Sequence, residues 1–161
     1  TLAAMCCNEG GRLVSDDVLD TWVVGSRAFA HRGGKFLRLR EGSKALADGA
    51  AASDTASIDG RLLWAAAPTS SDVVPIDAIV FPRLRPVGAE LRLEKLSRRA
   101  GLFALLGTPR VHGWDHAPTA ARQLEGLVKL VECAPVSVLE IPWGTQLSAA
   151  DRQRITDKIL G

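Results

Sequence analysis

Hydrophobic and polar positions change their spacing several times along the chain, and each spacing predicts an element. Over residues 118–133, Ala121, Leu124, Leu127, Val128 and Val131 recur every three or four positions, the period of a helix with one buried face. The run "RRAGLFALLG" predicts a shorter helix that Ser97 caps and Gly107 closes. Ser148 and Asp151 form a capping-box pattern, which predicts a final helix after them.

Short apolar runs between these helices predict strands. The densest run, Ile76 to Phe81 within "VPIDAIVFPRL", predicts the central strand of a sheet, ended by Pro82. We also expect strands at "RLLWAAA", "AELRLEKLS" and "VSVLEIP". "TWVVGSRAFAH" and "GKFLRLRE", separated by Arg32-Gly33-Gly34, predict a hairpin. Residues 41–60 are small and polar, and predict an irregular loop.

The first residues, "TLAAMCCNEGG", predict a helix ended by Gly10 or Gly11 in a left-handed conformation. This helix has no N-cap residue, so we expect that the chain has lost its natural N-terminus. "RLVSDD" then predicts a short buried strand that ends at Asp16 and Asp17. The order of elements predicts a single α/β domain over residues 1–161, with a mixed sheet flanked by helices.

Composition narrows the classes of protein that fit this pattern. The 161 residues suit one domain, and 47% hydrophobic with 24% charged residues is typical of a globular protein. A net charge of +2 and the absence of tyrosine argue against nucleic-acid binding, and no apolar run reaches membrane-spanning length. The chain opens on no signal peptide, and its three cysteines include an adjacent pair that bridges poorly. These features predict a cytoplasmic protein with reduced thiols.

The N-terminal segment "TLAAMCCNEGGRLVSDDVL" resembles part of the HPr kinase/phosphorylase-like P-loop kinases. In that family a glycine-rich loop ending in Gly-Lys-Ser-Thr opens a helix, and a later strand ends in Ala/Ser-Asp-Asp. The resemblance places Thr1 directly after the serine of that loop, beside the nucleotide, and matches Asp16 and Asp17 to the acidic pair. It implies a P-loop-kinase-like fold, ATP and Mg²⁺ as cofactors, a protein or small-molecule hydroxyl as acceptor, and a ring-like homo-oligomer.

The chemistry of phosphoryl transfer gives the acidic pair its expected roles. Mg²⁺ prefers hard oxygen ligands, and a second carboxylate can take the proton of the attacking hydroxyl or orient it. We expect Asp16 on the metal side and Asp17 as the base, although the two roles can be exchanged. Consecutive strand residues point to opposite faces, so both carboxylates reach one ligand only where the chain bends, as residues 18–20 allow.

Arg83 follows the apolar run in "IVFPRL", where the resemblance implies a phosphate or substrate contact. A solvated arginine at a strand end is the other interpretation of this residue. Six basic residues between positions 83 and 99 lie among Glu90 and Glu94, and both a basic binding surface and an ordinary charged edge strand fit them.

The sequence departs from the family in two places. It contains no G-x-x-x-x-G-K-[ST] loop, so this chain alone is expected to be inactive. "HRGGKFLRLRE" keeps only Arg32-Gly33 of the family's Arg-Gly-Leu-Gly-like signature, which disfavours HPr itself as the substrate. The alternative to a kinase is a non-catalytic α/β accessory domain that binds another protein.

Two further groups have metal-binding or redox residue types. His112 and His116 have the spacing of a helical metal pair, but Gly113 and Pro118 disfavour a regular helix there, so we expect Asp115 or His116 to cap the next helix. At least one member of the adjacent cysteine pair at positions 6 and 7 is expected to be a small core residue.

Overall fold

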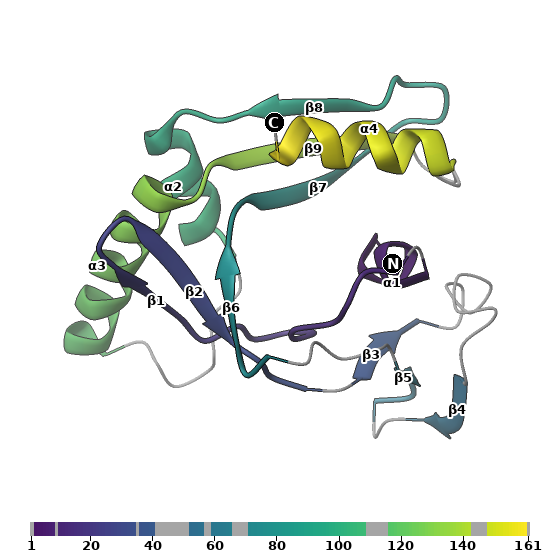
Figure 1. Ribbon diagram of the computed structural model, residues 1–161, viewed down its shortest axis with the longest axis horizontal. Helices are drawn as coiled ribbons and strands as arrows, with labels where there is room; N and C mark the ends of the chain where they lie inside the picture. The colour runs from purple at the N-terminus through teal and green to yellow at the C-terminus, as the bar shows by residue number, and fades with distance from the viewer. Residues whose placement is uncertain are drawn as a thin grey trace. The chain divides into compact units, whose positions relative to one another are not determined.

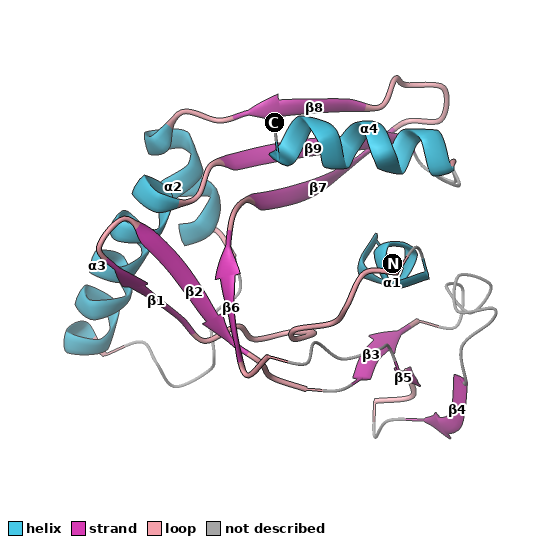
Figure 2. Ribbon diagram, viewed as in Figure 1, coloured by secondary structure: helices cyan, strands magenta, loops and turns pink. Residues whose placement is uncertain are grey.

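The computed structural model describes residues 2–8, 10–34, 36–40, 52–56, 59–65, 71–108, 116–142 and 148–160 (Figure 1). Within these ranges the protein is mixed α/β, as predicted (Figure 2). Its described strands form three three-stranded sheets, so the expectation of one mixed sheet is wrong. The chain divides into two compact units, the first formed by residues 1–21 and 30–74 and the second by residues 22–29 and 75–161. A P-loop-kinase-like fold stays a prediction.

The first unit begins with helix α1 (Leu2–Asn8), where the sequence predicts one. The helix ends as expected, since Gly10 has a φ of 91° and its N–H donates to the Cys7 carbonyl at 3.1 Å. A small antiparallel sheet follows, in the order β3 (Phe36–Leu39), β5 (Leu62–Ala65) and β4 (Ala52–Ala56). The core of this unit consists of Ala4, Leu13, Leu37, Leu39 and Trp64.

Two expectations for the first unit are wrong. "RLVSDD" is not a buried strand, because only Leu13 makes a bridge and the chain bends at Asp16 and Asp17. Within the range expected to be an irregular loop, Ala52–Ala56 is strand β4, while residues 41–51 lie outside the described part of the chain. "RLLWAAA" does contain the predicted strand, β5.

The expected hairpin between residues 21–31 and 34–41 is also wrong. "TWVVGSRAFAH" holds two strands of its own, β1 (Thr21–Val24) and β2 (Arg27–His31), on either side of Gly25. Gly25 has a φ of 59°, which a tight turn between two strands requires. These strands lie in a sheet ordered β1-β2-β6, whereas β3 pairs with β5. The glycine inside the first run therefore marked the true turn.

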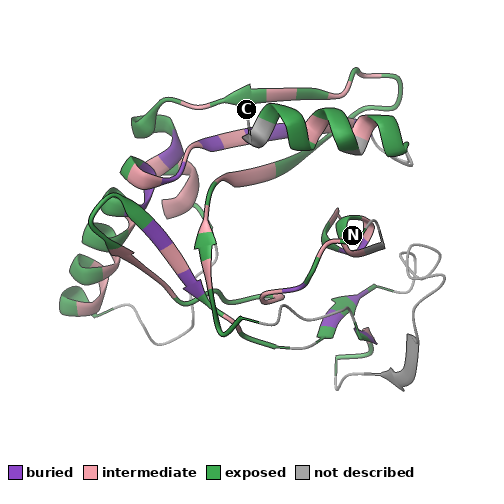
Figure 3. Ribbon diagram, viewed as in Figure 1, coloured by how far each residue is buried: buried purple, intermediate pink, exposed green. Residues whose placement is uncertain are grey.

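The second unit is built on β9 (Val136–Pro142), which lies between β7 (Ile79–Arg85) and β8 (Arg92–Lys95). β9 runs parallel to β7 and antiparallel to β8. Val136, Val138 and Leu139 of β9 are buried, as Figure 3 shows for this strand. The strands predicted at "VSVLEIP" and "AELRLEKLS" are confirmed.

The apolar run at residues 74–84 is not a central strand. It breaks after Ile76 into β6 (Val73–Ile76) and β7, and β7 occupies an edge of its sheet. Pro82 does not end the strand but lies within it, opposite Leu139. Proline lacks the N–H that a second neighbouring strand would need, so an edge position tolerates it where a central one would not.

The three helices of the second unit lie where the sequence predicts them. α2 (Arg98–Leu106) starts at Ser97, whose Oγ accepts from the N–H of Ala100 at 3.2 Å, and Gly107 closes it. α3 (Ala117–Cys133) follows His116 and contributes Leu130 to a core that also contains Ala28 and Ala134. None of the helices in the described ranges combines the length and hydropathy that crossing a bilayer requires.

Helix α4 (Ala149–Leu160) begins with the predicted capping box. The N–H of Asp151 donates to Ser148 Oγ at 3.1 Å, while the N–H and hydroxyl of Ser148 both donate to Asp151 Oδ2, at 3.1 and 2.7 Å. The Ser148 hydroxyl, and after it the Arg154 guanidinium, holds the pKa of the Asp151 carboxyl below its ordinary value.

We predict opposite effects for alanine at two helical glycines. A Cβ at Gly101 of α2 would lie 2.9 Å from Val136 Cβ, whereas a Cβ at Gly126 of α3 would meet nothing within 4 Å. Gly101→Ala should therefore lower the free energy of unfolding by about 1–2 kcal/mol through overpacking. Gly126→Ala should raise it by about 0.5–1 kcal/mol through helix propensity. Urea unfolding measures both, and equal stability of the two variants would contradict this packing of α2 on β9.

We predict that the α4 cap weakens in acid. Because the folded pKa of Asp151 is lowered, its contribution is complete above the unfolded pKa of about 4 and is lost as pH falls through the folded value. Ser148→Ala should return the NMR-titrated pKa of Asp151 toward its ordinary value and lower thermal stability at pH 7 more than at pH 2. Asp157→Asn in the same helix is the control and should leave the Asp151 titration unchanged.

Candidate functional site

The two aspartates lie in a tight turn, residues 15–18, which we call the acidic turn. The Ser15 hydroxyl donates to the Val18 carbonyl at 2.5 Å and closes it. Gly33 packs against the turn, since a Cβ at that position would lie 2.5 Å from Ser15 Oγ, and its N–H donates to the Val14 carbonyl at 2.8 Å. The Ser15 hydroxyl thus closes the turn, and Gly33 lies so close to it that a larger residue would displace the Ser15 side chain.

Arg38 of β3 contacts both carboxylates. Asp16 Oδ2 accepts from the backbone N–H of Arg38 at 3.0 Å and lies 3.5 Å from its Nε. The Nη2 atom of Arg38 forms an ion pair with Asp17. Because the chain bends at both aspartates instead of running as a strand, consecutive carboxylates reach the same guanidinium.

The position of Arg38 follows from the pattern of its strand. In "FLRL" the two leucines at 37 and 39 are buried in the core, so Arg38 lies on the exposed side of β3. β3 is an edge strand, and Asp16 accepts from the backbone N–H of Arg38. Sequence reasoning missed Arg38, although the alternation of leucine and arginine was a signal that this side chain is exposed.

The charge of this cluster is one negative unit, since two carboxylates share one guanidinium. The Asp16 and Asp17 side chains are 21% and 47% exposed, so both remain accessible to solvent. Asp16 binds the backbone of β3 and is the more enclosed of the two, while Asp17 is the more available for chemistry.

The predicted magnesium site fits these residues in part. Carboxylate oxygens are suitable ligands, and Mg²⁺ is commonly held by one or two carboxylates together with the phosphates of a substrate. No group of three or more His, Cys, Asp or Glu in the described ranges could hold a metal ion by itself. The carboxylates of the described residues therefore do not make a closed protein site for the ion.

The other predicted site residues lie elsewhere. Arg83 is in β7 of the second unit, directly opposite Glu140 in the strand register, with its Nη1 3.6 Å from Glu140 Oε1. Thr1 lies outside the described residues. Of the four predicted positions, the structure thus brings together Asp16 and Asp17, and adds Arg38 to them.

The histidine and cysteine candidates that the structure describes lie at a helix cap and in a partly buried position, and neither forms a metal or redox site. His116 occupies the N-cap position of α3, as expected, and its Nε2 lies 2.8 Å from Thr119 Oγ1. His112 and Asp115 lie outside the described residues. Burial, and to a smaller extent the charge of Cys6, raises the pKa of the Cys7 thiol. A raised pKa keeps the thiol protonated at neutral pH, which is unsuited to nucleophilic or redox chemistry.

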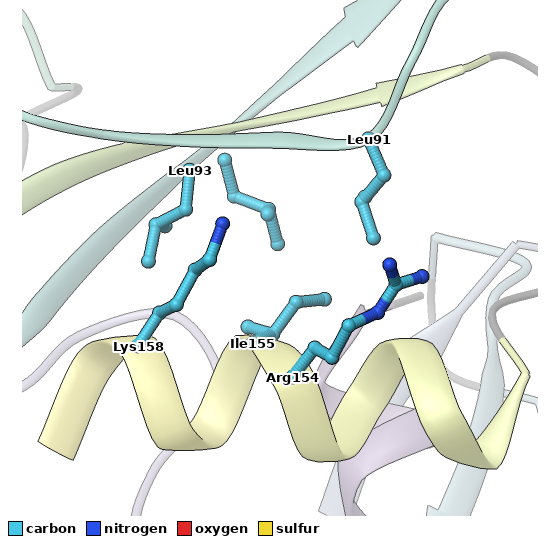
Figure 4. Close-up of a pocket in the computed structure, with 6 residues that line it drawn as sticks. Leu91, Leu93, Arg154, Ile155 and Lys158 are labelled. Carbon is cyan, nitrogen blue, oxygen red and sulfur yellow. The ribbon is translucent and has the colours of Figure 1, made fainter. Parts of the chain in front are cut away.

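A small hollow lies between α4 and the β7-β9-β8 sheet. Its lining is Leu91, Leu93, Leu139, Arg154, Ile155 and Lys158, and its volume is about 40 Å³. Figure 4 shows Arg154 and Lys158 rising from α4 on either side of Ile155, with Leu91 and Leu93 above them. A hollow of this size admits ordered water, while pockets that enclose ligands measure about 300–1,000 Å³. It is therefore too small for a nucleotide.

No protein-family model matches the chain, and comparisons with curated proteins and with solved structures find no significant match.

We predict that Arg38 stabilises the first unit through its ion pairs. Arg38→Gln should lower the free energy of unfolding by about 0.5–1 kcal/mol, because two neighbouring carboxylates lose their shared cation. Since exposed ion pairs are screened, the loss should shrink in 1 M salt. Arg40→Gln is the matched control, because Arg40 is exposed and forms no ion pair with another described residue. Equal urea midpoints for the two variants would contradict the contact.

Proposed function

We propose that this chain is part of an ATP-dependent phosphotransferase that transfers a phosphoryl group to a hydroxyl of a protein or small molecule. The chemistry follows the resemblance to HPr kinase/phosphorylase-like proteins. Under this proposal a phosphate-binding loop precedes Thr1, and this chain alone is inactive. ATP and Mg²⁺ are the cofactors, a serine-type hydroxyl is the acceptor, the enzyme works in the cytoplasm, and it assembles as a homo-oligomer.

One observation supports the proposal above all: two consecutive carboxylates are directed at the same point. A regular strand would send Asp16 and Asp17 to opposite faces, and the acidic turn removes that obstacle. Their meeting at Arg38 means that a single ligand can be approached by both. Phosphoryl transfer can use this arrangement, because its catalysis depends chiefly on positioning and charge.

Each residue of the cluster then has a role. Asp17, the more exposed carboxylate, accepts the proton of the acceptor hydroxyl and orients its oxygen for attack. Asp16, fixed by the backbone of β3, would hold Mg²⁺ together with the nucleotide phosphates, and the ion would neutralise their charge. Arg38 is a positioning residue that keeps the two carboxylates together. The assignments of Asp16 and Asp17 can be exchanged without changing the reaction.

Asp17→Asn tests this proposal in the chain joined to the phosphate-binding loop that the proposal places before Thr1. We expect transfer of labelled phosphate from ATP to a hydroxyl acceptor, or to water, to fall by about 100-fold or more, the usual contribution of a general base. Asp16→Asn should in addition raise the Mg²⁺ concentration needed for half-maximal rate.

Asp72→Asn is the matched control for this experiment. Asp72 also forms an ion pair with an arginine of the first unit, Arg32, but its side chain is 84% exposed and lies outside the acidic turn. Its substitution should leave the rate unchanged. Transfer that is insensitive to both Asp16→Asn and Asp17→Asn would reject the proposed roles.

A second candidate is a non-catalytic accessory domain that binds another protein. The ion pairs of Arg38 with both aspartates favour it, because in this interpretation the acidic turn only stabilises the edge strand β3. It predicts no phosphate transfer by the joined chain, together with a loss of stability in Asp16→Asn that matches Arg38→Gln.

A further inference from the structure

The face of the β7-β9-β8 sheet that carries Val136 is apolar where β7 and β9 start. At the start of β7 and β9, Ile79 packs against the core that contains Leu130, and Gly101 of α2 approaches Val136. The opposite face carries Leu93 and Leu139, which line the hollow beneath α4. Further along the face that carries Val136, Val138 is still buried, and where β7 and β9 finish the arginine side chains are exposed while Glu140 is largely enclosed.

Four residues define this end, which we call the arginine face: Arg83, Arg85, Arg92 and Glu140. Arg83 and Arg92 lie directly opposite Glu140 on its two neighbouring strands, so the three form one row across the sheet. Arg85 is two residues beyond Arg83 on β7 and therefore points to the same face. The exposed fractions of the Arg83, Arg85 and Arg92 side chains are 59%, 49% and 68%.

Glu140 pairs with two of these arginines, Arg83 and Arg85, and leaves their N–H groups without a hydrogen bond to it. Its Oε1 lies 3.6 Å from Arg83 Nη1 and 3.8 Å from Arg85 Nε, distances of ion pairs that are too long for hydrogen bonds. Glu94 Oε2 is 4.0 Å from Arg92 Nη2. Within the described ranges, none of the three guanidinium groups donates a hydrogen bond to another residue. Their N–H groups remain available to a ligand.

The charge of the face favours an anion. Three guanidinium groups face Glu140 and the neighbouring Glu94, which leaves one positive unit. Glu140 lies between the arginines and is only 17% exposed. One guanidinium fork satisfies a carboxylate, whereas a phosphate offers three acceptor oxygens and up to two negative charges. Arg83 and Arg85 lie on one side of Glu140 and Arg92 on the other, so together they offer more donors than one carboxylate can use. They therefore match phosphate better than carboxylate.

The place in the fold points to a ligand independently of the charge. β7 and β9 are parallel, and Arg83, Arg85 and Glu140 lie at their carboxyl ends. In open α/β sheets ligands bind in the crevice outside the carboxyl ends of parallel strands. Arg92 lies on β8, the other neighbour of β9.

We propose that the arginine face is a binding site for a phosphate group, carried by inorganic phosphate or by a phosphorylated small molecule. Arg83, Arg85 and Arg92 donate to the phosphate oxygens, and Glu140 is a positioning residue that keeps Arg83 and Arg85 on the same side of the sheet. The site lies wholly in the second unit and does not depend on the function proposed for the acidic turn.

The test is a titration of the whole chain, with its arginine Nε–H groups followed by NMR. Inorganic phosphate, glycerol phosphate and acetate are added separately at constant ionic strength. We expect the Nε–H signals of Arg83, Arg85 and Arg92 to shift along one common saturation curve with phosphate. The signal of Arg122, an exposed arginine of α3, should not follow this curve. Tighter binding of glycerol phosphate than of phosphate would identify a phosphate ester as the ligand.

Variants give the second measurement. Arg83→Gln should weaken phosphate binding by about tenfold, as expected for the loss of a charge-assisted hydrogen bond, while Arg122→Gln should leave it unchanged. Both side chains are exposed, so melting temperatures should stay at that of the parent chain. Equal binding of acetate, unsaturable shifts shared by Arg122, or an equal effect of the two variants would each overturn the proposal.

Discussion

The contact of Arg38 with two carboxylates is the interaction on which the arrangement of the first unit depends. The guanidinium reaches Asp17, and the backbone N–H and Nε of the same residue reach Asp16. The acidic turn is thereby attached to the edge of β3, and the core of the unit lies on the other side of that strand, beneath Leu37 and Leu39. Any chemistry of the two aspartates begins from the positions that Arg38 gives them.

The second unit contains the reverse arrangement. There one carboxylate, Glu140, lies among three arginines, so the local charge is positive where that of the acidic turn is negative. Arg38 lies on the exposed side of β3, and the three arginines of the second cluster are also exposed to solvent. Exposed ion pairs add little stability, so the main effect of both clusters is to fix the direction of side chains.

Both units have small cores, and this makes close contacts between elements important. In the second unit α2 approaches β9 only because Gly101 has no side chain to meet Val136. In the first unit Gly33 allows the acidic turn to approach in the same way, beside Ser15. Neither glycine has a positive φ, so the requirement at both positions is space and not backbone conformation.

The sequence by itself determined the helices and their ends, and the chemical identity of the acidic pair. Ser97, Ser148 and Gly10 form hydrogen bonds with residues three positions away in the chain. Their effect on the helix ends can therefore be predicted from the neighbouring sequence. Only the tertiary structure decided which strands pair, that Ile79–Arg85 lies at an edge, and that Arg38 joins Asp16 across 22 positions. Such contacts depend on which distant segments can be buried together, and the local pattern of the chain does not contain that information.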